Sequence, residues 1–236
     1  MFVGGGTLPM GGHAKALPEL VTETSREGRE RCGGAVVTVG LDGVRVESAL
    51  AAGELKCPVC EGALRPWGWA RRRLLRGERG MSVLLRPRRS RCRSCGLSHV
   101  LLPGFALARR ADVLSVIGEA LAAAAAGAGA RRAAEQVSRS VETVRGWLRR
   151  FRARAEQLRI LFTALLVDTA PDPIPPVGTG NLVADALSAI AGAAAAARSR
   201  WPDAVGEVRV WRFAAAVSHG QLLAPGWPLG VSSPRI

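Results

Sequence analysis

The feature that most constrains this chain is a pair of Cys-x-x-Cys motifs. The first is Cys57-Pro-Val-Cys60, and the second is Cys92-Arg-Ser-Cys95, which Gly96 follows. Two intervening residues let a tight turn aim both sulfur atoms at one metal ion, and two such turns supply the four thiolates of a tetrahedral Zn²⁺ site. A glycine after the second pair permits the positive φ that such a turn commonly needs. The spacing therefore predicts one structural Zn²⁺ per chain, bound by Cys57, Cys60, Cys92 and Cys95.

Disulfide bonds and a redox-active Cys-x-x-Cys are the competing interpretations of the four cysteines. Disulfides require an oxidising compartment, and the segment from Met1 to Gly12 lacks the basic start and the sustained apolar run of a secretory signal. A redox motif needs only one cysteine pair, placed beside a βαβ pattern. Because a closed four-sulfur site leaves no position for water or substrate, the ion is expected to stabilise the fold and not to catalyse.

The net charge suggests a polyanionic partner. The 236 residues carry a formal charge of +14, with a pI near 11.4, and such an excess attracts nucleic acid. Only Lys15 and Lys56 are lysine, however, and Ala, Gly and Arg are all abundant. GC-rich codon usage gives the same composition without selection for function, so the positions of the arginines matter more than their number.

Two apolar segments, 113–130 and 182–197, are mainly alanine and contain Glu119 and Asp185. Acidic side chains in short, Ala-rich segments argue against membrane spans. We therefore predict a cytoplasmic protein without a membrane partner, in a reducing compartment where metal-bound thiolates persist.

The segment between the two cysteine pairs predicts a long β-hairpin. Its arms are 64–75 and 82–91, and its tip is 77–80. Arms of this length reach far beyond one zinc site, so the distal part is expected to be a solvated ribbon. A third strand is expected over 97–102, where His99 is interpreted as a strand residue because four thiolates already complete the site.

Arginines crowd the distal end of this hairpin. They are Arg71, Arg72, Arg73, Arg76 and Arg79. Trp67 and Trp69 lie two residues apart and are expected to share one face of the strand. One interpretation is a solvated, self-repelling loop. Guanidinium groups also match phosphate oxygens, and the nearby tryptophans favour a nucleic-acid contact through Arg71, Arg72 and Arg73.

Three helices are predicted after the ribbon. The first covers 113–126, with Asp112 as its N-cap and Gly127 after its end. A short second helix over 131–137 leads into a turn at 138–140. Ser140 is expected to cap the third helix, which continues to about residue 167. The apolar residues that recur at helical spacing near its start are Val141, Val144, Trp147, Leu148 and Phe151.

The second and third helices have the pattern of a helix-turn-helix. Ala134 is small where two such helices approach each other, and Val144 occupies a buried position. Ser138 departs from the usual glycine of the turn, and Arg139 from the usual apolar residue. A plain helical hairpin is the alternative, but the polar face of the third helix favours insertion into a major groove. The candidate DNA-binding residues are Arg139, Ser140, Glu142, Thr143, Arg145, Arg149 and Arg150, together with Arg71, Arg72 and Arg73 of the hairpin.

These patterns together predict an α+β chain. A small four-cysteine zinc ribbon, built on an antiparallel hairpin, precedes a mainly α-helical helix-turn-helix domain and a helical C-terminal region. The predicted boundaries are 1–33 for a disordered N-terminal extension, 34–104 for a short hairpin and helix plus the ribbon, 105–168 for the helix-turn-helix domain with its extended third helix, and 169–236 for a linker, a helix and an irregular tail. The short hairpin is expected to pair 35–39 with 44–46, followed by helical turns over 47–55.

The C-terminal region is predicted to be helical and to serve packing or dimerisation. Leu158, Leu161 and Leu165 form an apolar stripe that fits a partner helix in a homodimer as well as it fits a core. Asn181 is expected to cap a helix over 182–200, and 208–213 is expected to form a strand or another helical turn.

Five motifs occur together in this chain: Cys57-Pro-Val-Cys60, Trp67-Gly-Trp-Ala-Arg71, Cys92-Arg-Ser-Cys95-Gly96, Val100-Leu-Leu-Pro103 and Trp147-Leu-Arg-Arg-Phe151. The combination resembles the zinc-ribbon plus helix-turn-helix proteins of high-GC bacteria, a family known only as a domain of unknown function. The similarity covers about residues 44–160 and extends to the N-terminal DNA-binding region of insertion-sequence transposases. In those transposases a ribonuclease-H-like domain with three separated acidic residues follows, a layout that the residues after Ile160 do not show. The resemblance therefore implies DNA recognition without strand-transfer chemistry.

We predict a sequence-specific DNA-binding protein and not an enzyme, either a transcriptional regulator or an accessory of a mobile element. Double-stranded DNA would be the partner, read in the major groove and held by the basic ribbon at its phosphates. A degenerate or split transposase is the second hypothesis, and it requires clustered carboxylates that bind Mg²⁺. The third is an RNA-binding or protein-docking zinc ribbon for which the helices are a scaffold.

Overall fold

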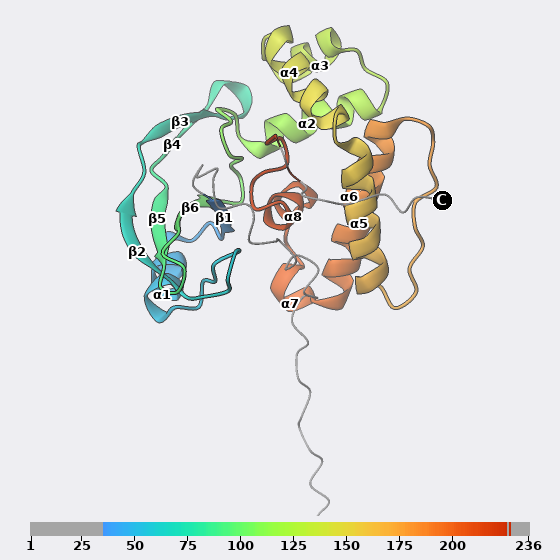
Figure 1. The fold of residues 1–236 in the computed structure, drawn as a ribbon. Coiled ribbons are helices and arrows are strands. Elements are labelled where there is room, and N and C mark those ends of the chain that lie inside the picture. Colours follow the sequence, from blue (N-terminus) through green and yellow to red (C-terminus); the bar gives the residue numbers. More distant parts are fainter. Residues whose placement is uncertain (1–34, 226, 228–236) are drawn as a thin grey trace, which may run out of the picture. The chain divides into compact units, whose positions relative to one another are not determined.

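The computed structural model describes residues 35–225 and Trp227 (Figure 1). The extension predicted over 1–33 and the end of the predicted tail, 228–236, lie outside the described residues. The described residues have an α+β architecture, in which a β-rich part precedes a series of helices.

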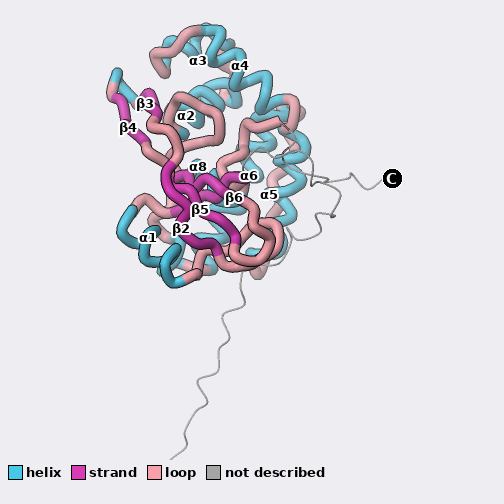
Figure 2. The backbone as a smooth tube through the Cα atoms, turned by 60° about the vertical axis from the view of Figure 1, so that its left-hand side comes forward, coloured by secondary structure: helices cyan, strands magenta, loops and turns pink. Residues whose placement is uncertain are grey.

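A four-stranded sheet forms the first part, with the strand order β1-β6-β5-β2. Its strands are β1 (Ala35–Val39), β2 (Leu64–Trp69), β5 (Arg88–Cys92) and β6 (Ser98–Pro103). Strand β6 is antiparallel to β5 and parallel to β1, whereas β2 pairs with β5 as the antiparallel edge strand. Figure 2 shows β2, β5 and β6 running side by side in magenta. The third strand expected over 97–102 is therefore present as β6.

The hairpin expected to pair 35–39 with 44–46 is wrong. Helix α1 (Gly43–Ala52) occupies the second of these segments. The Asp42 carboxylate accepts hydrogen bonds from the backbone N–H groups of Val44 and Arg45, which nucleates a helix at this point. Strand β1 instead pairs with β6, far along the chain, and a local pattern carries no information about such a distant partner.

The long hairpin between the cysteine pairs is confirmed, and it consists of two successive pairs of strands. Beyond β2 and β5, strand β3 (Arg73–Arg76) pairs antiparallel with β4 (Ser82–Leu85), and a 3₁₀ turn at Glu78–Gly80 closes the tip. The expectation of a solvated distal ribbon holds for most of β3 and β4, whose residues are largely exposed, but it is wrong at Leu75. Leu75 is completely buried in the core that the helices form, and the backbone of Arg76 bonds to Ala111 and Val113.

The shared face expected for Trp67 and Trp69 is also contradicted. The β2–β5 register shifts between Pro66 and Trp69, so β2 carries one extra residue, as in a β-bulge. An extra residue reverses the alternation of side chains, and Trp69 then lies opposite Arg88 on the other face from Trp67. The rings stack on different guanidinium groups, Trp67 with those of Arg65 and Arg91 and Trp69 with those of Arg86 and Arg88.

In the described part of the chain, seven helices follow the sheet. They are α2 (Leu114–Ala125), α3 (Ala130–Gln136), α4 (Val141–Arg152), α5 (Ala155–Thr169), α6 (Leu182–Arg200), α7 (Pro202–Val205) and α8 (Val210–Val217). The helices predicted at 113–126, 131–137 and 182–200 are therefore present, and the alternative of a strand over 208–213 is resolved in favour of a helix. One apolar core takes side chains from α2 to α6, from α8 and from β3.

Two details of the helix prediction are wrong. The predicted third helix does not run unbroken to residue 167, because Ala153 and Arg154 form a turn between α4 and α5. This break turns α5 into contact with α6, beside which it lies in Figure 1. Asp112 is not the N-cap of α2, since Val113 holds that position without a side-chain cap. Asn181 does cap α6, through bonds from the backbone N–H groups of Val183 and Ala184.

The apolar stripe of α5 is a core face. Leu158 and Phe162 are completely buried, and Leu161 and Leu165 pack against the same core. Helix α6 is long and apolar enough to span a membrane by length and composition. One side of α6, which includes Ala186, Ala189 and Ala193, is buried against the rest of the described chain, as in the core helix of a globular domain.

Candidate metal centre and nucleic-acid interface

The two Cys-x-x-Cys turns meet at one point. The Sγ atoms of Cys57, Cys60, Cys92 and Cys95 all lie within 4.8 Å of one another. The Sγ–Sγ distance is 3.7 Å between Cys57 and Cys95 and 3.5 Å between Cys60 and Cys92. A tetrahedral ion at about 2.3 Å from each sulfur holds the sulfurs about 3.8 Å apart. The cluster is therefore compatible with a structural metal ion, and it unites the four residues predicted as ligands.

The turns have the backbone that the motif requires. Gly96 has a φ of 73°, the left-handed conformation expected after the second pair. Gly62 allows a close approach, because a Cβ at this position would lie 2.3 Å from Ser94 Oγ and 3.0 Å from Cys92 Sγ. The backbone N–H groups of Ser94 and Cys95 point at Cys92 Sγ, at 3.4 and 3.5 Å. Such N–H groups stabilise a thiolate.

Burial and hydrogen bonding shift the pKa values of two of the thiols in opposite directions. Burial raises the pKa of the Cys57 thiol to about 12. At Cys92 burial acts in the same direction, but the N–H groups of Cys95 and Ser94 and the neighbouring thiols outweigh it and lower the pKa to about 6. Hydrogen bonding therefore favours the thiolate at Cys92, whereas burial favours the neutral thiol at Cys57 in the absence of a cation.

His99 lies next to this cluster. Its Nε2 is 3.3 Å from Cys57 Sγ, its side chain is completely buried, and its Nδ1 has no partner among the described residues. It is a strand residue of β6, as the sequence predicts, and it can donate a hydrogen bond to the Cys57 sulfur. Such an outer contact orients a ligand and moderates its charge.

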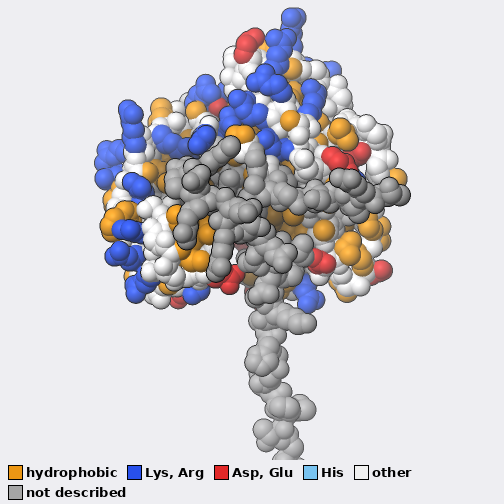
Figure 3. Space-filling model, viewed as in Figure 1, with side chains coloured by type: hydrophobic (Ala, Val, Ile, Leu, Met, Phe, Trp, Pro, Cys, Tyr) orange, Lys and Arg blue, Asp and Glu red, His pale blue; other side chains and the backbone are white. Residues whose placement is uncertain are grey.

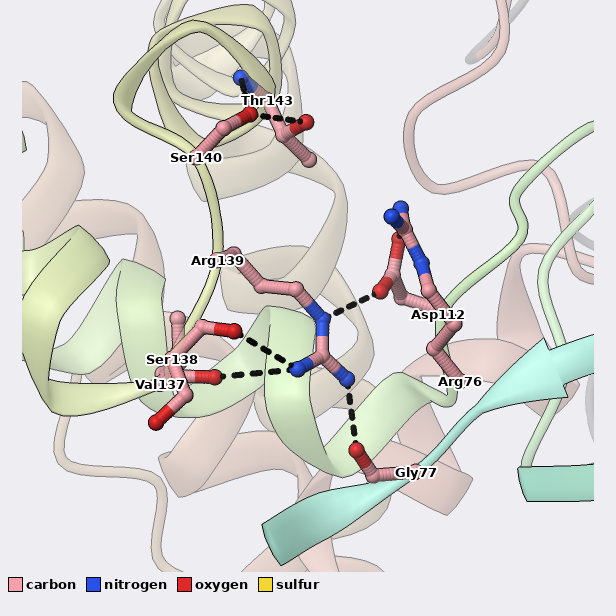
Figure 4. Close-up of polar contacts among 8 residues, drawn as sticks. All are labelled: Arg76, Gly77, Asp112, Val137, Ser138, Arg139, Ser140 and Thr143. Atoms are coloured by element: carbon pink, nitrogen blue, oxygen red, sulfur yellow. Dashed lines mark hydrogen bonds and ion pairs between the residues drawn. The ribbon is translucent and has the colours of Figure 1, made fainter. Parts of the chain in front are cut away.

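Arg139 is a correction to the predicted DNA-binding set. Its side chain is only 8% exposed, and its Nε donates a hydrogen bond to Asp112 Oδ1 at 2.6 Å. Its Nη2 donates to the carbonyl of Gly77 at the hairpin tip, and its Nη1 to the carbonyls of Val137 and Ser138 (Figure 4). All of its nitrogens are thus used within the chain, and Arg139 fixes the turn before α4.

The other predicted residues of α4 lie on its outer surface. The side chains of Glu142 and Arg145 are 78% and 63% exposed, and they form an ion pair at 3.6 Å. Arg149 is exposed and Arg150 is half-buried. Ser140 caps the helix as predicted, because its Oγ accepts from the backbone N–H of Thr143 at 3.3 Å. The apolar side, with Val144 and Phe151, faces the core.

The hairpin arginines do not behave as one group. Arg71 and Arg72 are exposed. Arg73 is half-buried, and burial lowers the pKa of its guanidinium. Its Nε and one Nη have no partner among the described residues. Only Arg71 and Arg72 are therefore available to meet phosphates in the way that the sequence predicts.

A hollow of ≈ 420 Å³ opens between α4 and the segment that precedes α2. The arginines that line it are Arg76, Arg109, Arg110, Arg149 and Arg150. The sequence patterns do not single out Arg109 and Arg110, because these residues belong to no recognised motif. Their one signal is that they are adjacent just before a helix. The structure thus joins two predicted arginines of α4 with two that the sequence does not mark.

Comparison with known proteins identifies one domain. The comparisons with curated proteins and with solved structures give no match. The model of the DUF6431 family, described as a domain of unknown function, matches from the first cysteine of the cluster to Trp147 in α4. A DUF6431 domain of unknown function therefore spans residues 57–147 of this chain.

Proposed function

We propose that the protein binds double-stranded DNA by inserting α4 into the major groove. The observation that carries this proposal is the two-sided character of α4. Val144, Trp147 and Phe151 anchor one side in the core, while Glu142 and Arg145 stand exposed in its first turns on the other. A helix held in this way presents side chains to base edges in its first turns and arginines to phosphates later.

The geometry before α4 supports a helix-turn-helix. Ser138 has a φ of 52°, so it adopts the left-handed conformation for which glycine is common in this turn. Ala134 and Val144 are almost completely buried between the two helices. Ser138 therefore differs from the usual helix-turn-helix in residue type but not in backbone conformation. Arg139, which stands where an apolar residue is usual, forms an ion pair inside the chain.

The charge distribution favours the same partner. Figure 3 shows blue Lys and Arg side chains along the hairpin side of the molecule and around α3 and α4, with few acidic side chains among them. Exposed residues in these regions include Arg71, Arg72 and Arg145. Phosphate contacts from such residues add affinity for any sequence, whereas contacts in the first turns of α4 select a sequence.

For the cysteine cluster we infer a single Zn²⁺ with a structural role. Four thiolates at these distances suit Zn²⁺ more than the hard cations, which prefer oxygen ligands. The ion would link the turn that precedes β2 to the turn that follows β5. The hairpin, and with it the support for α4, then depends on the metal.

Selection of bound sequences from a random duplex pool tests the function directly. We expect enrichment of a defined motif by the full chain, and loss of that enrichment for Arg145→Ala. Competition between duplex DNA and structured RNA distinguishes this function from that of an RNA-binding ribbon. A nicking assay with Mg²⁺ tests for transposase chemistry. Recovery of no motif, with RNA competing better than duplex DNA, would overturn the proposal.

Regulator and mobile-element accessory are both consistent with this activity, and we place either in the cytoplasm. Homodimerisation also remains a prediction, because helix-turn-helix proteins often meet two half-sites. The α5 stripe is not available for it, since Leu158 is buried within the chain. Sedimentation of the free and the DNA-bound protein measures the oligomeric state.

A further inference from the structure

The hollow beside α4 holds positive charge that the described chain does not neutralise. Arg76 is paired with Asp112 at 2.7 Å. By contrast, Arg109, Arg110 and Arg150 have no carboxylate within salt-bridge distance among the described residues. A basic surface without its own counter-ions is what a bound anion would complete.

Contacts with backbone carbonyls hold two of these arginines in place. Arg110 donates from Nη2 to the carbonyl of Leu223 at 3.2 Å, and its buried Nε has no partner among the described residues. Arg150 donates from Nη1 to the carbonyl of Gly146 at 2.8 Å. Burial lowers the pKa of Arg110, and the nearby charges of Arg150, Arg154 and Arg109 lower it further. The fold therefore keeps like charges together at a cost that an anion would relieve.

Gly146 lets the Arg150 side chain lie against α4 at the floor of the hollow. A glycine inside a helix lowers helix stability relative to alanine, so its presence in the middle of α4 needs a reason. Gly146 is buried, and a Cβ at this position would lie 2.9 Å from Arg150 Nη1, so the Arg150 side chain occupies the space that a side chain here would need. The missing side chain allows Arg150 to lie along the helix, which holds its guanidinium at the hollow.

The loop opposite α4 has an unusual backbone conformation. Arg109 has a φ of 58°, which residues with a side chain rarely adopt. This conformation places Arg109 and Arg110, which are adjacent in sequence, on the same hollow. Strained backbone is typical of positions that a ligand uses.

We propose that this hollow binds a phosphate group of the DNA backbone, with Arg110 and Arg150 as its principal ligands and with Gly146 as the residue that lets Arg150 lie in position. The proposal rests on the duplex binding by α4 proposed above. A helix in the major groove has backbone phosphates on both sides of it, and guanidinium groups bind phosphate oxygens with charge-assisted hydrogen bonds. Glu142 also lines the hollow and would repel an anion, but it is paired with Arg145.

Gly146→Ala is the most direct test, because it separates stability from binding. The added methyl group favours the helix and displaces only the end of the flexible Arg150 side chain, so the variant should fold with an equal or higher Tm. It should nevertheless bind a mixed-sequence DNA duplex more weakly than the wild-type chain. A role of Gly146 in folding alone predicts a lower Tm with unchanged affinity.

Charge variants give the second readout. Arg110→Ala and Arg150→Ala should each weaken duplex binding about tenfold at low salt and reduce the slope of log affinity against log salt by about one. Arg209→Ala is the matched control, since Arg209 is exposed before α8 and does not line the hollow. It removes the same charge and should have a much smaller effect.

The outcomes distinguish this site from the proposed function. If the wild-type chain binds no duplex, both fail. If it binds, and Arg145→Ala changes the preferred sequence, but the hollow variants behave like Arg209→Ala, the hollow alone fails. A Tm measurement with inorganic phosphate is the remaining test. If it raises the Tm of the wild type and not of Arg110→Ala, while duplex affinity is equal in both, the site takes free phosphate and the assignment to DNA is overturned.

Discussion

Asp112 Oδ1 lies 2.6 Å from Arg139 Nε, and both side chains are more than nine-tenths buried. The second carboxylate oxygen of Asp112 accepts from Arg76 at 2.7 Å, and Arg139 also reaches the carbonyl of Gly77 (Figure 4). One carboxylate therefore joins the hairpin tip, the segment before α2 and the turn before α4. The position of α4 relative to the hairpin depends on this contact.

Asp112→Asn should destabilise the protein. The change leaves the buried guanidinium of Arg139 without a counter-charge, and removal of one partner from a buried pair costs about 3–5 kcal/mol of the free energy of unfolding. Urea unfolding measures the loss. Glu142→Gln is the control, because it breaks an exposed pair that contributes at most about 1 kcal/mol. Equal stability of the two variants would contradict a central role for Asp112.

Cys92→Ser should abolish metal binding. Three remaining sulfurs leave the site incomplete, and metal binding supplies much of the folding free energy of a small metal-bound ribbon. Elemental analysis should give one zinc ion per wild-type chain and far less in the variant. Cys32, the fifth cysteine of the sequence, lies outside the described residues. Cys32→Ser is the matched control, because four other thiols already complete the site, and it should keep its zinc. Full zinc in Cys92→Ser would remove that cysteine from the ligand set.

Leu75→Ala should be much more destabilising than the same change at its neighbour. Leu75 is completely buried and belongs to the core of the helices, whereas Leu74 is 58% exposed on the other side of β3. Truncation of a buried leucine costs about 2–5 kcal/mol. Unfolding curves of Leu75→Ala and Leu74→Ala should therefore separate clearly. Similar curves would mean that the hairpin does not depend on its contact with the helices.

Local sequence signals predicted the parts of the structure that local physics decides. The cysteine spacing places four thiolates together, Ser140 and Asn181 cap their helices as expected, and the hairpin arms pair in the expected order. Each of these depends on residues close in sequence or on a spacing fixed by metal geometry.

Long-range contacts decide the parts that the sequence did not predict. Strand β1 pairs with a strand far along the chain, and one extra residue in β2 separates Trp67 from Trp69. Arginine is a residue type that commonly contacts DNA, but the side chain of Arg139 is paired with Asp112 inside the fold. The position of Leu75 in the helical core is equally hidden, because nothing near it in sequence shows that the hairpin folds onto the helices. The arginine hollow arises from the same kind of long-range assembly.

Asp185 should give the stability a pH dependence in acid. Its Oδ1 accepts hydrogen bonds from the backbone N–H and the hydroxyl of Thr179 at 2.8 and 2.7 Å, and these bonds lower the pKa of the carboxyl below its ordinary 3.8. A lowered folded-state pKa contributes stability above the unfolded value, and that stability is lost as the pH falls through the folded value. The stability difference between wild type and Asp185→Asn should therefore be present at neutral pH and shrink below pH 3.8. A difference that is constant with pH would contradict the shift.

The two exposed basic surfaces should differ in what they contribute to DNA binding. Arg145 lies in the first turns of α4, where a good bidentate base contact discriminates by about 1–3 kcal/mol, so Arg145→Ala should relax sequence preference. Arg71 and Arg72 are exposed on the hairpin and should meet phosphates only. Replacing both by alanine should weaken all duplexes alike and flatten the plot of log affinity against log salt. Binding of matched and scrambled duplexes at several salt concentrations measures both effects. If the hairpin variant instead changed the preferred sequence while Arg145→Ala did not, the hairpin would read the bases and α4 would hold the backbone.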